Sequence, residues 1–360
     1  MRGSCRLYVI REFFGLLIAT ILLAAPSANG ADLPKLDIDP RQISVSGLSS
    51  GGYMAVQFQL AYSALVMGAG VIAGGPYYCA QGNLWIASPN CVCLTKLSCI
   101  WAPTTRDLPH LIEITDQNAQ SGAIDPISNL RRHRIWMFSS ELDSVVRQEV
   151  MDDLRKYYLH YVDNSNIAYK RDLPAEHAMP TDFFGPECMH MGDPYINNCN
   201  FDAAGALLAW IHGPLNGGRN EPGGSPNAFA QGKFLADPTR HGLAQEGWIY
   251  VPDDCRSGQC RLHVAFHGCD QYPSHKYNDT RGQEVRFGKT FVMNSGFNQW
   301  ADRNRIVVLY PQAEAIPDSN PQGCWDWWGF DDPDYAKKTG RQIAAVKRMI
   351  DAIMGAAHTR

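Results

Sequence analysis

The 360-residue sequence has little net charge of either sign and almost no long apolar run. Its 32 Lys and Arg residues nearly balance 36 Asp and Glu residues, which leaves a net charge of −4. Without an excess of basic residues the chain offers no electrostatic surface to a polyanion, so nucleic acid is excluded as a partner. Beyond its first 30 residues no apolar run is long enough to cross a bilayer, and we expect no stable membrane insertion.

Residues 1–30 have the pattern of a cleavable secretory signal. Basic residues come first, residues 13–25 form a short apolar run, and small residues follow from Ala28 onward. An uncleaved N-terminal anchor is the alternative. We predict that residues 1–30 are removed and that residues 31–360 form a single secreted domain, extracellular or periplasmic.

Ten of the eleven cysteines lie beyond the predicted signal, and an even number in a secreted chain indicates disulfides. Close spacing favours Cys188 with Cys199 and Cys255 with Cys260. The spacing of the cysteines between residues 91 and 99 lacks a usual zinc-finger pattern, so we expect no metal. Two further bridges are expected within a set whose pairing stays open: Cys79, Cys91, Cys93 and Cys99.

Short apolar runs alternate with segments of helical periodicity along the chain, which predicts an α/β fold with a mostly parallel central sheet and helices on both faces. The expected strands are residues 42–46, 69–73, 134–138, 167–170, 248–251, 262–266 and 306–309. The expected helices start at residue 51 and cover residues 111–130, 148–161, 201–211 and 337–354.

The segment Gly47-Leu48-Ser49-Ser50-Gly51 joins the first expected strand to the first expected helix. G-x-S-x-G between a strand and a helix is typical of the nucleophile elbow of α/β-hydrolases, in which a sharp turn raises the serine hydroxyl above the sheet. The two glycines are needed because side chains at these positions would clash inside the turn. Ser49 is the predicted nucleophile.

A nucleophilic serine needs a base and a carboxylate that orients the base. Asp143 follows the strand at 134–138, and His177 lies in a loop after the next strand. The resulting order of Ser, Asp and His is the one expected downstream of such an elbow. Asp143 also fits a helix N-cap. The alternatives are Glu141 for the acid and His190, His212 or His267 for the base.

His267-Gly268-Cys269 follows the strand at 262–266 and is similar to the loop that supplies an oxyanion donor in lipases and esterases. We therefore assign the Ser50 and Cys269 amides to the oxyanion hole and a structural role to the His267 ring. No cofactor is required. Cys269 and Cys324 remain as a disulfide pair.

Large aromatic residues gather directly after Cys324. We interpret Trp325, Trp327 and Trp328, together with Tyr53 beside the elbow, as an apolar wall for the substrate. Core packing of the large rings is the alternative interpretation.

The order of the segments differs from that of an ordinary α/β-hydrolase. The oxyanion-type loop follows the elbow by more than two hundred residues, and no strand follows the helix at 337–354. In the standard order such a helix leads into the strand before the nucleophile. We predict a circular permutation, with residues 213–226, rich in Gly, Pro and Asn, as the permutation linker. Residues 76–109 are expected to form a disulfide-rich lid or rim insertion.

Four runs, at residues 46–54, 142–146, 266–269 and 324–328, resemble the secreted, single-domain, circularly permuted poly(3-hydroxybutyrate) depolymerases. The resemblance implies a serine esterase acting on a polyester or oligoester, with Ser49, Asp143 and His177 as the triad. It also implies amides of Ser50 and Cys269 in the oxyanion hole and a tryptophan of residues 325–328 beside the polymer. We expect a monomer.

Two other functions remain open at this point. The same elbow and triad serve a feruloyl or acetylxylan-type carbohydrate esterase. A hydrolase fold without catalysis that binds a polymer is the second alternative. No Ser- or Thr-rich linker or separate polymer-binding module is evident, so adsorption to a polymer would depend on exposed apolar residues of the domain itself.

Overall fold

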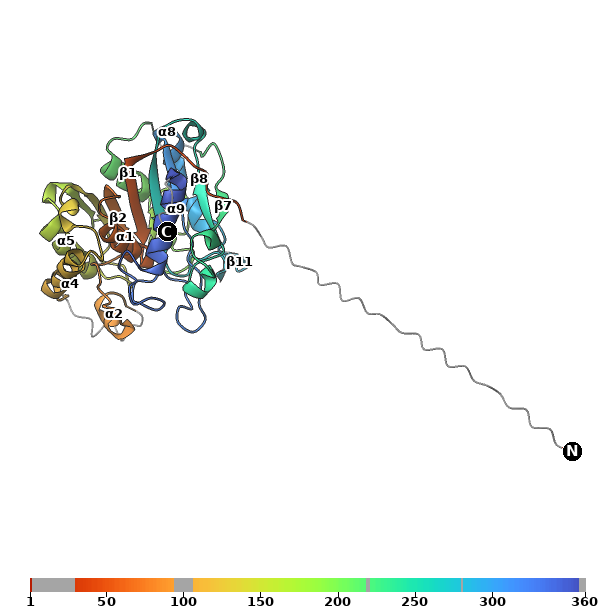
Figure 1. Ribbon diagram of the computed structural model, residues 1–360, viewed down its shortest axis with the longest axis horizontal. Coiled ribbons are helices and arrows are strands. Elements are labelled where there is room, and N and C mark those ends of the chain that lie inside the picture. Colours follow the sequence, from red (N-terminus) through yellow and green to blue (C-terminus); the bar gives the residue numbers. More distant parts are fainter. Residues whose placement is uncertain (2–29, 94–105, 218–220, 280, 356–360) are drawn as a thin grey trace.

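The computed structural model describes residues 1, 30–93, 106–217, 221–279 and 281–355 (Figure 1). The predicted signal at 1–30 therefore lies outside the described residues except for its two ends. Within the described residues, no helix combines the length and the apolar character needed to span a membrane.

Eight strands form the central sheet, in the order β4-β3-β2-β1-β9-β12-β8-β7. The first six of these are parallel to one another. β8 is antiparallel to β12, and β7 is antiparallel to β8. The strands are β1 (Ile38–Leu48), β2 (Gly68–Ile72), β3 (Arg134–Phe138), β4 (Ile167–Lys170), β7 (Asn227–Ala230), β8 (Glu246–Tyr250), β9 (Cys260–Phe266) and β12 (Ile306–Tyr310).

Successive side chains of the parallel strands enter two different cores, one on each face of the sheet. In β3, Ile135 and Met137 belong to one core and Trp136 and Phe138 to the other. This is why the central strands are nearly continuous apolar runs, since a parallel sheet covered on both faces has no polar side. The predicted fold class is confirmed.

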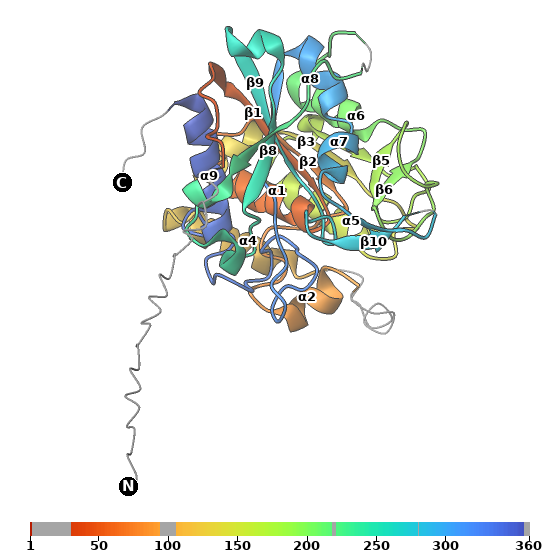
Figure 2. The same ribbon diagram turned by 90° about the vertical axis from the view of Figure 1, so that its right-hand side faces the viewer.

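Helices cover both faces of the sheet (Figure 2). One core includes apolar side chains of α1 (Ser50–Ala61), α5 (Gln148–Tyr161) and α9 (Arg341–Met354), and α4 (Leu108–Gln120) packs at its margin. The opposite core includes apolar side chains of α6 (Ala203–His212), α7 (Thr290–Asn294) and α8 (Asn298–Asn304). The other described α-helix is α2 (Leu84–Asn90), and the short strands outside the central sheet are β5 (Met179–Thr181), β6 (Ile196–Asn198), β10 (Lys276–Asn278) and β11 (Glu284–Arg286).

The helical stretch expected at 111–130 is divided in the structure. α4 ends at Gln120, and a separate 3-10 helix covers Ile127–Arg132. Pro126 lies directly before the second segment, and a proline there cannot continue the hydrogen bonding of an α-helix. The antiparallel pairing of β8 and the strand β7 were not expected from the sequence.

The end of α9 lies beside the start of β1. The Leu36 amide donates a hydrogen bond of 2.7 Å to the Ile353 carbonyl. Two segments from opposite ends of the sequence therefore meet at the edge where β1 enters the sheet. This contact is the one that the predicted permutation requires, whereas the linker at 213–226 includes residues 218–220, which lie outside the described residues.

Four disulfides are present among the described residues. Cys188–Cys199, Cys255–Cys260 and Cys269–Cys324 are the three pairs expected from the sequence. Cys79 pairs with Cys91. Cys93 is also disulfide-bonded, and Cys99 lies outside the described residues.

Candidate active site

The candidate catalytic residues all follow the carboxyl ends of parallel strands. Ser49 comes directly after β1, and the segment 267–269 comes directly after β9. Asp143 follows β3, and His177 follows β4. Because β1, β3, β4 and β9 run in the same direction, these loops meet at one edge of the sheet, where ligands of open α/β sheets bind.

Ser49 occupies the sharp turn between β1 and α1. Its backbone has φ of 57° and ψ of −123°, a combination that L-residues rarely adopt. The Ser49 amide donates to the Ile72 carbonyl at 2.9 Å, and the Ser49 carbonyl accepts from the Tyr53 amide at 3.0 Å. The strand and helix thus hold the turn that the elbow motif predicts.

The two flanking glycines are required by space. A Cβ on Gly47 would lie 2.1 Å from the Gly51 carbonyl oxygen. A Cβ on Gly51 would lie 2.3 Å from the His267 carbonyl oxygen and 2.4 Å from that of Phe266. All of these neighbours are backbone atoms, which cannot move aside without displacing α1 or the end of β9.

His177 and Asp143 form a buried pair. His177 Nδ1 lies 2.9 Å from Asp143 Oδ2 and 3.1 Å from Oδ1, so the ring N–H donates to the carboxylate. Asp143 Oδ1 also accepts from the amides of Val145 and Val146 at 2.9 and 2.8 Å. Asp143 therefore combines the two roles that the sequence left as alternatives, a cap for the following turn and a partner for a histidine.

Glu176 supports this pair and was missed in the sequence. Its Oε2 accepts from the Ser144 amide at 3.1 Å, the Ser144 hydroxyl at 3.1 Å and the His177 amide at 2.9 Å. A single carboxylate thus ties the loop that carries the acid to the loop that carries the histidine. Its position next to His177 in the sequence was the available signal.

The alternative residues lie elsewhere or have other partners. Glu141 is exposed. His190 Nε2 bonds the Asp193 carbonyl at 3.2 Å, and His212 Nε2 bonds Ser44 Oγ at 2.8 Å. The fully buried His267 ring donates from Nδ1 to the Gly268 carbonyl at 2.7 Å and accepts the Ala313 amide at Nε2 at 3.0 Å. Burial lowers its pKa to about 4, so this ring is neutral and structural.

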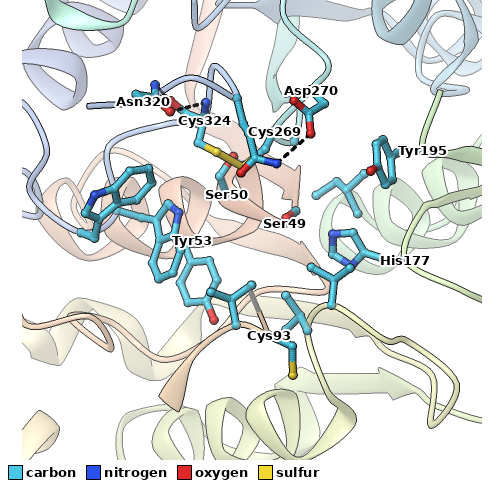
Figure 3. Close-up of a pocket in the computed structure, with 18 of the residues that line it drawn as sticks. Ser49, Ser50, Tyr53, Cys93, His177, Tyr195, Cys269, Asp270, Asn320 and Cys324 are labelled. Carbon is cyan, nitrogen blue, oxygen red and sulfur yellow. Dashed lines mark hydrogen bonds between the residues drawn. A yellow bond between two sulfur atoms is a disulfide. The ribbon is translucent and has the colours of Figure 1, made fainter. Parts of the chain in front are cut away.

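Ser49 and His177 line the same cavity, which has a volume of about 350 Å³. Figure 3 shows Ser49 and the His177 ring facing this common space, with Ser50 and Cys269 above them. A Cβ on Gly268 would lie 3.4 Å from Ser49 Cβ, so the loop after β9 passes close to the serine. Within the described parts of the chain, neither the Ser50 amide nor the Cys269 amide has a hydrogen-bond acceptor.

The three tryptophans separate in the structure. Trp327 and Trp328 line the cavity, and the Trp327 ring stacks on Tyr53 with ring centres 4.4 Å apart. Trp325 is fully buried beneath the cavity and does not line it. The assignment of Trp325 to substrate contact is therefore corrected, because its indole is enclosed by the core and packs edge-on against Phe266.

No group of three or more His, Cys, Asp or Glu side chains is arranged to hold a metal ion anywhere in the described part of the chain. The cavity is mostly apolar apart from the serine, the histidine and a few polar groups at its rim. Its geometry suits acyl transfer at a carbonyl group.

No family model matches the sequence. A poly(3-hydroxybutyrate) depolymerase of Delftia acidovorans is 46% identical over 342 residues, which cover 93% of this chain and 64% of that protein. A polyhydroxybutyrate depolymerase of Talaromyces funiculosus is 37% identical, and the match covers 93% of this chain and 96% of that protein. The chain belongs to the polyhydroxybutyrate depolymerase family.

Two solved structures of polyhydroxybutyrate depolymerases support this. One is from Penicillium funiculosum, and the other carries a Ser to Ala replacement and is complexed with an R3HB trimer. Each is 34% identical to this chain, with a TM-score of 0.78, and each match covers 91% of this chain and 100% of that one. Members of this family are serine-dependent carboxylic ester hydrolases.

Two residues that support the oxyanion-type loop of this depolymerase family member were not expected. The Trp325 indole N–H donates to the His267 carbonyl at 3.0 Å. The buried Gln271 accepts the Gly268 amide at 2.6 Å and donates to the Pro194 carbonyl at 2.8 Å. Hydrogen bonds from both sides thus hold the segment that ends at Cys269. No motif in the sequence marks Gln271, and Trp325 was expected to contact the substrate instead.

Proposed function

We propose that this protein hydrolyses ester bonds of poly(3-hydroxybutyrate) or its oligomers through an acyl-enzyme on Ser49. The observation that carries the proposal is one cavity lined by both a serine in a nucleophile elbow and the His177 ring, whose other nitrogen is held by Asp143 at 2.9 Å. The family supports the choice of polyester as the substrate, since an R3HB trimer is bound in a related depolymerase structure.

In the first half of the reaction, His177 Nε2 takes the Ser49 proton while Ser49 Oγ attacks the ester carbonyl carbon. The resulting oxyanion accepts hydrogen bonds from the Ser50 and Cys269 amides, and Asp143 stabilises the imidazolium. Collapse of the intermediate breaks the bond to the ester oxygen. This oxygen takes the proton from His177 and leaves as the hydroxyl group of the shortened product.

In the second half, a water molecule gives a proton to His177 and attacks the 3-hydroxyacyl-Ser49 carbonyl. The same amides hold the second oxyanion, and Ser49 leaves with the proton returned by His177. Each step uses side chains, backbone amides and water alone. Trp327, Trp328 and Tyr53 form an apolar wall against which the methyl and methylene groups of a polyester pack.

We also propose that residues 76–109 form a rim of the catalytic domain. Leu84, Val92 and Cys93 of this segment line the cavity, which supports the assignment. The disulfides support folding in an oxidising compartment, and hence secretion after removal of residues 1–30. A single chain contributes every residue of the proposed site, which supports action as a monomer.

Replacement of the nucleophile tests the proposal. We expect Ser49→Ala to lower kcat on amorphous polyhydroxybutyrate and on short p-nitrophenyl esters by about a millionfold. Ser121→Ala, at an exposed position after α4, is the matched control and retains activity. A fluorophosphonate reagent labels the wild type and the control but not Ser49→Ala.

The same assay separates the competing functions. Release of ferulate or acetate from xylan, without release of 3-hydroxybutyrate oligomers from the polymer, would show that the substrate is a carbohydrate ester and not a polyester. If folded wild-type protein neither reacts with the fluorophosphonate nor hydrolyses any ester, the result would favour a polymer-binding protein without catalysis. Ester hydrolysis retained by Ser49→Ala would remove Ser49 as the nucleophile.

A further inference from the structure

The described lining of the cavity has an acidic group and, apart from the catalytic His177, no basic one. Among the described residues that line it, Asp270 is the one carboxylate, and no Lys or Arg is present. The interior of a polyester chain is neutral, but its two ends differ, because one is a hydroxyl group and the other is a carboxylate. A cavity with a negative charge repels the carboxylate end of an oligomer and does not repel the hydroxyl end.

Asp270 is held in place by its backbone and by its neighbour. Its φ of 58° is in the left-handed region, which Asp and Asn adopt more readily than most residues. Its amide donates to the Gln322 carbonyl at 2.7 Å, and its Oδ2 accepts from Gln322 Nε2 at 3.0 Å. The backbone and one side-chain hydrogen bond thus orient the carboxylate at the cavity wall.

The charges around Asp270 do not cancel its own. The basic side chain that acts on Asp270 is His275, whose Nε2 lies 2.9 Å from Asp193 Oδ1. A protonated His275 is balanced by Asp193, and a neutral His275 adds no positive charge, so in either state the cluster keeps at least the negative charge of Asp270. Burial raises the pKa of Asp270, while His275 and the Gln322 amide act in the opposite direction.

Asp270 lies on the histidine side of the cavity. Figure 3 shows Asp270 beside Tyr195, on the side of Ser49 away from Tyr53. The Tyr195 ring in turn contacts the His177 ring edge-on, with ring centres 6.2 Å apart. Since His177 delivers a proton to the departing ester oxygen, the leaving hydroxyacid lies on this same side.

On the basis of the function proposed above, we propose that Asp270 is a specificity-determining residue that disfavours cleavage of the ester next to the free carboxylate end of an oligomer. In the dimer acid, the carboxylate of the leaving monomer is separated from the scissile oxygen by only two carbon atoms. It therefore enters the region of Asp270 with a like charge, and the described lining of the cavity offers no Lys or Arg to meet it. Internal esters bring no charge there and are cleaved without this cost.

The repulsion by Asp270 can be measured by comparing a charged substrate with a neutral one. The dimer of (R)-3-hydroxybutyrate and its methyl ester share the ester bond between the two units, and esterification removes the one negative charge. Release of methyl 3-hydroxybutyrate, rather than of methanol, reports cleavage of the shared bond in the methyl ester. At about pH 8, where carboxyl groups are ionised, we expect kcat/KM of the wild type to be roughly tenfold higher for the methyl ester, the scale of a partly screened repulsion. For the trimer cleaved at the ester nearest its hydroxyl end, the carboxylate lies one unit farther from the scissile bond. The ratio of methyl ester to acid is therefore expected to be smaller for this cleavage.

Asp270→Asn removes the charge and keeps the shape, the acceptor oxygen and a tolerated backbone conformation. We expect its ratio of methyl ester to acid for the dimer to fall several-fold toward one. The control is Asp254→Asn, an exposed carboxylate near the start of β9 at the opposite edge of the sheet, which leaves the ratio unchanged.

A salt series on the wild type gives a second measurement that needs no variant. Added salt is expected to raise kcat/KM for the dimer acid more than for the methyl ester, because it screens the repulsion. A ratio that is unchanged by both Asp270→Asn and salt would overturn the role of Asp270. Failure of the proposed function has a different signature, since the neutral methyl ester would then not be hydrolysed by the wild type either.

Discussion

The Ser49 backbone is kept in its unusual conformation by atoms on both sides of the turn. Residues 47 and 51 approach carbonyl oxygens so closely that a single added carbon has no room. The motif in the sequence thus reflects a packing requirement between β1, α1 and β9, in addition to the chemistry of the serine.

The first prediction concerns this requirement. We expect Gly51→Ala to lower kcat by about a hundredfold or more, because the new Cβ would push the serine or the loop after β9 by roughly an ångström. Gly224→Ala is the control, since a Cβ at that position meets nothing within 4 Å. Kinetics with a p-nitrophenyl ester and a thermal melt for each variant make the comparison. Normal kcat in Gly51→Ala would contradict the packing argument.

The second prediction separates two neighbouring tryptophans. Trp325→Phe removes the N–H that holds the His267 carbonyl, so we expect kcat to fall about tenfold, as for the loss of one oriented hydrogen bond, with KM nearly unchanged. Trp328→Ala removes part of the cavity wall, and we expect mainly a higher KM. Steady-state kinetics on a soluble oligoester distinguish the two. If Trp325→Phe changed KM alone, the result would indicate that Trp325 contacts the substrate.

At the scale of elements, the site depends on loops that are held by strands and by a disulfide. Cys269–Cys324 joins the loop after β9 to the tryptophan-rich loop after β12, and both cysteines line the cavity. Cys255–Cys260 lies at the other end of β9, since Cys260 is the first residue of the strand. The two bridges at opposite ends of one strand form a matched pair for an experiment.

The third prediction uses this pair. Replacing Cys269 and Cys324 together by Ser is expected to lower stability by about 2–4 kcal/mol and to reduce kcat, because the Cys269 amide loses its anchor. Replacing Cys255 and Cys260 by Ser is expected to cost less stability, since that bridge closes a shorter loop, and to leave kcat unchanged. Urea unfolding and ester kinetics test both expectations. Equal kcat in the two double variants would show that the disulfide does not position the amide.

The sequence predicted strands and helices correctly where the pattern of apolar side chains was regular. The strand at 134–138 and the helix at 148–161 have the predicted bounds, because an uninterrupted apolar run and a clear helical period leave few alternatives. β7 was missed because Asn227–Ala230 is short and lies at the sheet edge, where few apolar residues are needed.

At the scale of the whole molecule, the two ends of the domain are neighbours. A Cβ on Gly355 would lie 3.7 Å from the Lys35 side chain, and Leu36 bonds the last turn of α9. A short linker would therefore restore the order in which a C-terminal helix leads into the strand before the nucleophile.

The fourth prediction tests this order. We expect a permutant in which a few glycines join Gly355 to Lys35, with new ends placed between residues 213 and 226, to fold and to hydrolyse esters at a rate close to that of the wild type. A second permutant, opened between Val264 and Ala265 in the centre of the sheet, is expected not to fold, because it interrupts β9. Circular dichroism and ester kinetics compare the two. An unfolded first permutant would count against the interpretation of 213–226 as a linker.

The sequence by itself determined the elbow, the candidate triad, the α/β class and three disulfide pairs. Most of these depend on local patterns: a glycine spacing, an apolar period and, for two of the three disulfides, a short distance between cysteines. The tertiary structure decided which of the three tryptophans line the cavity, how Glu176 and Gln271 support the loops, and where Asp270 lies. Such facts depend on contacts between residues far apart in the chain, and no local periodicity records which side chain meets which once the strands have come together.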